Sequence, residues 1–164
     1  MKNKKQFIGF LILAVVVVGL FMFGKKNATV PEQTPELFAV LLAEKKNTSV
    51  IQIGDVAVPV TLARTKQEQE KGLSGSSPLK EHTGLFFVFA SPNRHGIWMK
   101  DMQFPIDIVW ISPKGVVIYI EKNVSPDTYP KVFYSNGDDQ AVLEMNGGEV
   151  DALGIQVGDV VSVK

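Results

Sequence analysis

Three charged side chains lie in apolar parts of the sequence, where packing alone does not require them. Lys100 and Asp107 belong to the stretch GIWMKDMQFPIDIVWIS, and Glu144 belongs to VLEMN. Two neighbouring carboxylates could divide general acid and base roles, and a lysine beside them could stabilise negative charge. Trp98, two residues before Lys100, offers a flat ring on which a sugar could stack. Trp98, Lys100, Asp107 and Glu144 are therefore the candidate ligand-binding residues.

Asp107 is the least expected of these residues, because it interrupts an apolar segment. FPIDIVWIS (104–112) predicts a strand that places Asp107 on one face with Val109 and Ile111. A buried carboxylate needs a partner or a raised pKa. Lys100 could be that partner across a hairpin between 97–100 and 106–111. Alternatively, backbone amides of a loop could donate hydrogen bonds to the carboxylate, or it could bind a ligand. The other face of the strand is expected to be core, with Phe104, Ile106, Ile108 and Trp110.

Glu144 lies in a second predicted strand, 140–146, between Leu143 and Met145. One interpretation places it at a rim beside Asp107, where the two carboxylates would act as acid and base. The other is an exposed or ion-paired residue of an ordinary strand. The two glycines that follow Asn146 allow a close backbone approach, which suits either a turn or a ligand.

Most recognisable catalytic and cofactor motifs are missing from the sequence. The chain has no cysteine, which excludes disulfides, a thiolate nucleophile and cysteine zinc sites. His82 and His95 lack the spacing of metal ligands, and there is no phosphate-binding glycine loop, HExxH motif or nucleophile elbow. We therefore predict no metal and no cofactor, and the sequence leaves open whether the protein is an enzyme.

The N-terminal region predicts a membrane anchor. Residues 7–23 are seventeen apolar residues without a charge, which as a helix would span roughly 25 Å. The segment is longer than the apolar region of most cleaved signal peptides and lacks a good cleavage site, so an uncleaved signal anchor is favoured over a cleaved signal. The flanking lysines place the N-terminus in the cytoplasm and the rest of the chain outside.

The remaining sequence predicts a linker and one β-rich domain. After the anchor, 1–24, residues 25–47 form a juxtamembrane linker with a possible short helix that begins at Thr34-Pro35. From residue 48 the apolar pattern has a period of two, with seven to nine short strands and one or two short helices. Thr65 and Glu68 form a capping box for one of these helices. Residues 48–164 are thus expected to form a compact, mainly β (α+β) domain resembling a small β-barrel.

Several segments of this domain resemble the DUF192 family, also called UPF0127. The matching pieces include GLFFVF (84–89), WMKDMQFPIDIVWI (98–111), VLEMNGG (142–148) and GIQVGD (154–159), in the family's order and spacing. The resemblance implies a compact β-rich fold and, for many members, export or membrane attachment, without an established activity. The chain departs from the family pattern at Ser74-Gly75-Ser76, where many members have Met and Arg, and at Gly84, where many have Met.

These observations lead to three functional hypotheses. The first is a membrane-anchored extracytoplasmic domain that binds a cell-envelope small molecule, glycan or protein. The second is an envelope-polymer hydrolase with Asp107 and Glu144 as acid and base, and the third is an accessory or assembly module without a small ligand. Nucleic acid is not expected as a partner, because residues 48–164 carry a net charge of −4 and no Lys/Arg stripe.

Overall fold

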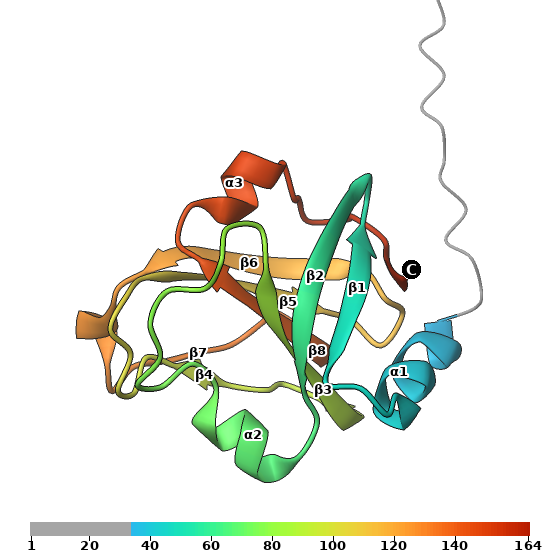
Figure 1. Cartoon of the computed structure of the whole chain (residues 1–164), viewed down its shortest axis with the longest axis horizontal. Helices are drawn as coiled ribbons and strands as arrows, with labels where there is room; N and C mark the ends of the chain where they lie inside the picture. The colour runs from blue at the N-terminus through green and yellow to red at the C-terminus, as the bar shows by residue number, and fades with distance from the viewer. Residues whose placement is uncertain (1–33) are drawn as a thin grey trace, which may run out of the picture.

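The computed structural model of the chain describes residues 34–164 (Figure 1). The expected membrane anchor, residues 7–23, lies outside these residues. Within the described residues, no helix has both the length and the apolar character needed to cross a membrane. The short helix that was expected to begin at Thr34-Pro35 is α1, Thr34–Ala43.

One seven-stranded sheet dominates the domain, so the prediction of a mainly β fold is confirmed. The strand order is β6-β5-β8-β3-β2-β1-β9, and only β2 and β3 are parallel. The strands are β1 (Thr48–Ile53), β2 (Val56–Ala63), β3 (Gly84–Asn93), β5 (Ile106–Ile111), β6 (Val117–Val124), β8 (Asp139–Asn146) and β9 (Val161–Val163).

The sheet curves into a half-barrel, which is less closed than the small β-barrel that the sequence predicted. Its two edge strands, β6 and β9, approach each other through a single bridge between Val116 and Val160. The Val161 amide also donates a 2.7 Å hydrogen bond to the Gly115 carbonyl. Because the contact involves residues before each strand, the ladder is joined at one end only.

A small two-stranded sheet and short helices cover the large sheet. β4 (Ile97–Trp98) pairs with β7 (Val132–Phe133), and both lie on the same side of the molecule as α2 (Lys66–Lys71) (Figure 1). The capping box predicted for α2 is confirmed, because the Thr65 hydroxyl accepts from the Glu68 amide and Glu68 accepts from the Thr65 amide. The remaining helices are α3 (Glu149–Leu153) and the 3-10 turn η1 (Pro126–Thr128).

The two faces of the large sheet carry separate hydrophobic clusters. One cluster contains Val109, Ile111 and the buried side chains of α1, and the other contains the four residues predicted for the opposite face of β5, which are Phe104, Ile106, Ile108 and Trp110. The alternation predicted for this strand is therefore confirmed. Trp110 is fully buried and is a core residue.

The predicted hairpin between 97–100 and 106–111 is wrong. β4 pairs with β7 instead of β5, in the register Ile97↔Phe133 and Trp98↔Val132. β5 is already paired on both edges, with β6 and with β8. No edge is left for the 97–100 segment, so it folds over the second cluster as part of the small sheet.

Candidate functional site

A narrow cleft opens between α2 and β4, and Glu144 forms part of its wall. The cleft has a volume of about 40 Å³. Its lining comes from α2 and the turn after it, from β3, from β4 and from β8, and includes Gln69, Gly72, Leu73, Phe87, Trp98 and Glu144. A concave site with convergent polar groups and one carboxyl of unusual pKa is a common form of a ligand site.

Glu144 is positioned by β8, a central strand of the sheet. It lies on β8 opposite Leu85 of β3 on one side and Ile108 of β5 on the other. Its side chain is 4% exposed, and its buried Oε2 atom has no hydrogen-bond partner among the described residues. Burial raises the pKa of Glu144 to about 8, because the charged form would lose its hydration. The carboxyl group is therefore mainly protonated at neutral pH and can donate a hydrogen bond.

The α2 wall of the cleft is fixed to the sheet. The Gln69 side-chain amide donates to the Val88 carbonyl at 3.0 Å, and the helix ends at Gly72, whose φ is 50°. A Cβ at Gly72 would lie 3.9 Å from Glu144 Oε2. The end of the helix therefore lies directly against the buried carboxyl. The Ser74 hydroxyl then donates to the Lys100 carbonyl at 2.7 Å, which joins this wall to the turn after β4.

Trp98 stands on the opposite wall. Its side chain is 48% exposed, although its neighbours in sequence, Ile97 and Met99, are buried. Gly96 keeps the backbone beside it close to β7, because a Cβ there would lie 2.6 Å from Val132 Cγ1. Trp98 and Glu144 are thus two sequence-predicted site residues that the structure brings together.

A second, larger lobe continues from the cleft toward His95. It has a volume of about 220 Å³, and the two lobes share six lining residues, which are Gln69, Glu70, Phe87, Gly96, Ile97 and Trp98. The larger lobe adds Lys66, Phe89 and His95 to this lining. The two lobes therefore form one continuous groove along α2.

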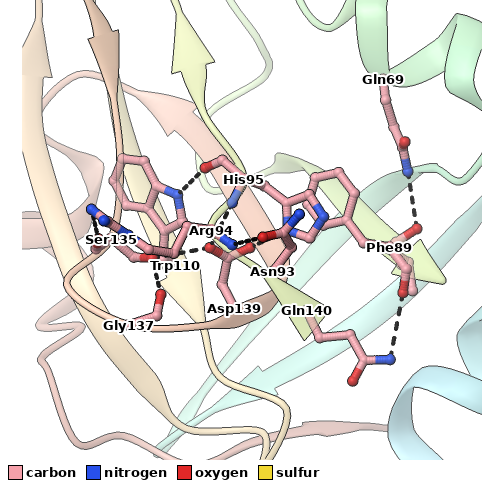
Figure 2. Close-up of polar contacts among 11 residues, drawn as sticks. Gln69, Phe89, Asn93, Arg94, His95, Trp110, Ser135, Gly137, Asp139 and Gln140 are labelled. Carbon is pink, nitrogen blue, oxygen red and sulfur yellow. Dashed lines mark hydrogen bonds and ion pairs between the residues drawn. The ribbon is translucent and has the colours of Figure 1, made fainter. Parts of the chain in front are cut away.

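His95 is held firmly in the larger lobe (Figure 2). Its Nδ1 atom lies 2.6 Å from Oδ1 of Asp139, and its ring stacks on Phe89 with a centroid distance of 3.5 Å. Asp139 is fully buried and also accepts from the His95 amide and from the Ser135 hydroxyl. Burial raises the pKa of Asp139, and the hydrogen bonds from His95 and Ser135 oppose that shift. Sequence reasoning missed this pair, because 44 residues separate its members.

Asp107 lies away from the groove, on the other face of the sheet. Its carboxylate is fully buried and accepts hydrogen bonds from the backbone amides of Asn123 at 2.7 Å and Val150 at 2.9 Å. Backbone amides therefore satisfy the carboxylate, as one alternative proposed, but they belong to β6 and α3 and not to a loop. The expected pair with Lys100 is not formed, because Lys100 is exposed in the turn after β4 and has no salt bridge to Asp107.

No cluster of metal-ligating side chains occurs within residues 34–164: no three His, Asp or Glu side chains there could hold an ion together. The groove itself contains two acids, Glu70 and Glu144, and one imidazole, His95, spread over the two lobes.

The crystal structures that resemble this fold include two with similar TM-scores. One is a candidate transcription regulator from Sinorhizobium meliloti, with a TM-score of 0.68 and 25% identity, over 73% of this chain and 97% of the other. The second is a protein of unknown function from Novosphingobium aromaticivorans, with a TM-score of 0.66 and 29% identity, over 73% of this chain and 88% of the other. None of the curated proteins matches the chain.

The family comparison agrees with the resemblance noted in the sequence. The model of DUF192, described as an uncharacterized ACR family, matches residues 49–163. The match includes β1 to β9 almost completely and every residue that lines the groove. The chain therefore belongs to the DUF192 family.

Proposed function

We propose that residues 48–164 form an extracytoplasmic domain, tethered by residues 7–23, that binds a saccharide of the cell envelope in the groove along α2. The buried and unpartnered Glu144 carboxyl is the observation that carries this proposal. An unpaired polar atom in a buried position costs free energy of about 1–3 kcal/mol, and a ligand that pairs with it recovers that cost.

The remaining lining suits a sugar better than a fully apolar ligand. Trp98 presents a half-exposed ring at the junction of the two lobes, and aromatic rings stack on the apolar faces of sugars. The larger lobe is also lined by four side chains that can form hydrogen bonds with hydroxyl groups, which are Lys66, Gln69, Glu70 and His95. Asp107 and Lys100, the other two candidates from the sequence, have no place in this proposal because neither lines the groove.

Calorimetric titration of the full-length protein in detergent tests the proposal, with soluble β-1,4-linked trisaccharides of glucose and of N-acetylglucosamine as probes. We expect at least one of them to bind and Trp98→Ala to weaken that binding at least tenfold. Tyr129→Ala is the matched control, because Tyr129 is equally exposed but does not line the groove. Absence of binding by both sugars, or equal losses in the two variants, would overturn the proposal.

Hydrolysis of an envelope polymer is a second candidate, favoured by the His95–Asp139 pair. A histidine whose Nδ1 faces a buried carboxylate has its other nitrogen available as a base. The acid would be Glu144, which lines the same groove, and Asp107 would have no part. Release of reducing ends from a hexasaccharide of N-acetylglucosamine tests this candidate. Turnover that His95→Gln abolishes would favour it, and binding without turnover would leave the domain a binding module.

The tether can be tested separately from the groove. Protease added to intact cells should cleave an epitope tag placed after Lys164, and a variant that lacks residues 7–23 should lose its membrane association in cell fractionation. A tag that is cleaved only after the cells are lysed would contradict the extracytoplasmic location.

A further inference from the structure

We infer that the groove selects a sugar that carries an acetamido group, and that the narrow cleft at Glu144 receives this substituent while the sugar ring lies in the larger lobe. The inference rests on the proposed saccharide binding and names the sugar class. It follows from the size of the narrow cleft, from the apolar side chains on its walls and from the buried, unpaired Oε2 atom of Glu144.

The size of the narrow cleft limits what can enter it. Its volume of about 40 Å³ corresponds to roughly three water molecules, and so to a substituent of a few heavy atoms. A sugar ring does not fit into that space. The larger lobe, at about 220 Å³, is the part of the groove that has room for a ring.

The walls of the narrow cleft require a substituent that is both apolar and polar. Leu73, Phe87 and Ile97 are buried apolar side chains that line it. A methyl group placed against them removes apolar surface from water, which favours binding. A hydroxyl or an amino group makes no such apolar contact with these three side chains.

The buried, unpaired Oε2 atom of Glu144 determines which polar group is accepted at this wall of the cleft. The protonated Glu144 carboxyl has one O–H to donate, and an acetamido carbonyl is an acceptor that suits it. An ammonium group has no lone pair to accept that proton. The acetamido group is thus the common sugar substituent that supplies a methyl group and an acceptor within a few atoms.

The charged groups near Glu144 do not change its assignment as the hydrogen-bond donor to the acetamido group. The charged side chains that line the narrow cleft are Glu70 and Lys71, both on α2 and both exposed. From β3, β4 and the turn after β4, the lining side chains are uncharged. Burial is the cause of the raised pKa of Glu144, about 8, so the donor is present at neutral pH and is lost above that value.

Three β-1,4-linked trisaccharides of equal length separate the possibilities in calorimetric titrations of the full-length protein at pH 7. They are built from N-acetylglucosamine, glucosamine and glucose. We expect the acetylated sugar to bind at least tenfold more tightly than either of the others. Equal affinity for the acetylated and the glucose trisaccharide would overturn the acetamido inference and leave saccharide binding intact. Failure of all three sugars to bind would overturn both.

Two substitutions at Glu144 test the role of the donor. Glu144→Gln keeps an N–H donor of nearly the same size, so it should retain the preference for the acetylated sugar at pH 7 and at pH 9. The wild-type protein should lose up to about tenfold in affinity for the acetylated sugar between these values, because the carboxyl, whose pKa is about 8, ionises. Glu144→Leu should lose the preference at both pH values, and Glu149→Gln, at a buried carboxyl that does not line the groove, should behave as wild type. A preference that survives in Glu144→Leu would contradict the inference.

Discussion

Asp107 and Glu144 lie on neighbouring strands, one register position apart, yet their side chains lie on opposite faces of the sheet. Asp107 of β5 is opposite Met145 of β8, and Ile108 is opposite Glu144. Because successive side chains of a strand alternate between faces, Glu144 shares its face with Ile108 and not with Asp107. The geometry therefore does not support these two carboxylates as the acid and base of one reaction. The hydrogen bonding of the two carboxyl groups also differs, because Asp107 accepts two backbone hydrogen bonds and Glu144 Oε2 accepts none.

The first prediction concerns the dependence of stability on pH. Burial raises the pKa of Glu144 from 4.5 to about 8 in the folded protein, so the folded state binds a proton that the unfolded state releases. The contribution of this residue to the free energy of unfolding should therefore fall as pH rises from about 4.5 to 8 and level off above 8. In Glu144→Gln this fall should disappear. Urea denaturation of both proteins between pH 5 and 9 is the measurement, and parallel pH profiles would contradict the assignment.

The second prediction concerns Asp107 as a structural residue. In Asp107→Asn one carboxylate oxygen becomes an NH₂ group, so either the Asn123 or the Val150 amide loses its acceptor. A buried donor without a partner costs about 1–3 kcal/mol, and we expect a loss of that size in the free energy of unfolding. Sugar binding should not change. Asp151→Asn is the control, because its exposed ion pair with Lys122 should contribute little. If both variants were equally stable, Asp107 would not hold β6 and α3 as described.

The third prediction concerns the three hydrogen bonds that Asp139 accepts. Asp139→Ala removes the acceptor for the His95 ring, the His95 amide and the Ser135 hydroxyl, whereas Ser135→Ala removes only one of these contacts. We therefore expect the larger loss of stability in Asp139→Ala, together with fast hydrogen exchange at the His95 amide. Hydrogen exchange measured by NMR distinguishes the two variants. An His95 amide that stays protected in Asp139→Ala would show that other contacts hold the loop.

The local sequence patterns predicted local structure correctly. They could not predict which residues far apart in the chain come together. The period of two correctly predicted a shared face for Phe104, Ile106, Ile108 and Trp110. The spacing of Thr65 and Glu68 correctly predicted a capping box. Both predictions succeeded because they depend only on residues that are close in the sequence. The pairing of β4 with β7 and the approach of His95 to Asp139 depend on contacts between residues 34 to 44 positions apart. The same limit applies to the faces of Asp107 and Glu144, which follow from the register between β5 and β8. Glu144 was identified because a charged residue between Leu143 and Met145 is unexpected in an apolar strand, and Trp98 because its flat ring could stack on a sugar.

The last prediction concerns Gly96, where the groove wall meets β7. A Cβ at this position would lie 2.6 Å from Val132 Cγ1 and 2.7 Å from Tyr134 Cε1. Both distances are shorter than real contacts allow, so Gly96→Ala must push β4 and β7 apart and shift Trp98, which is paired with Val132. We expect weaker sugar binding together with a shifted emission spectrum of Trp98. Gly137→Ala is the matched control, because a Cβ there would have nothing within 4 Å. Both variants are made with Trp110→Phe, because the Trp110 indole donates to the carbonyl of His95, next to Gly96, and would otherwise respond as well. A spectral change confined to Gly96→Ala then reports on Trp98. Unchanged affinity in Gly96→Ala would mean that the position of this wall does not govern binding.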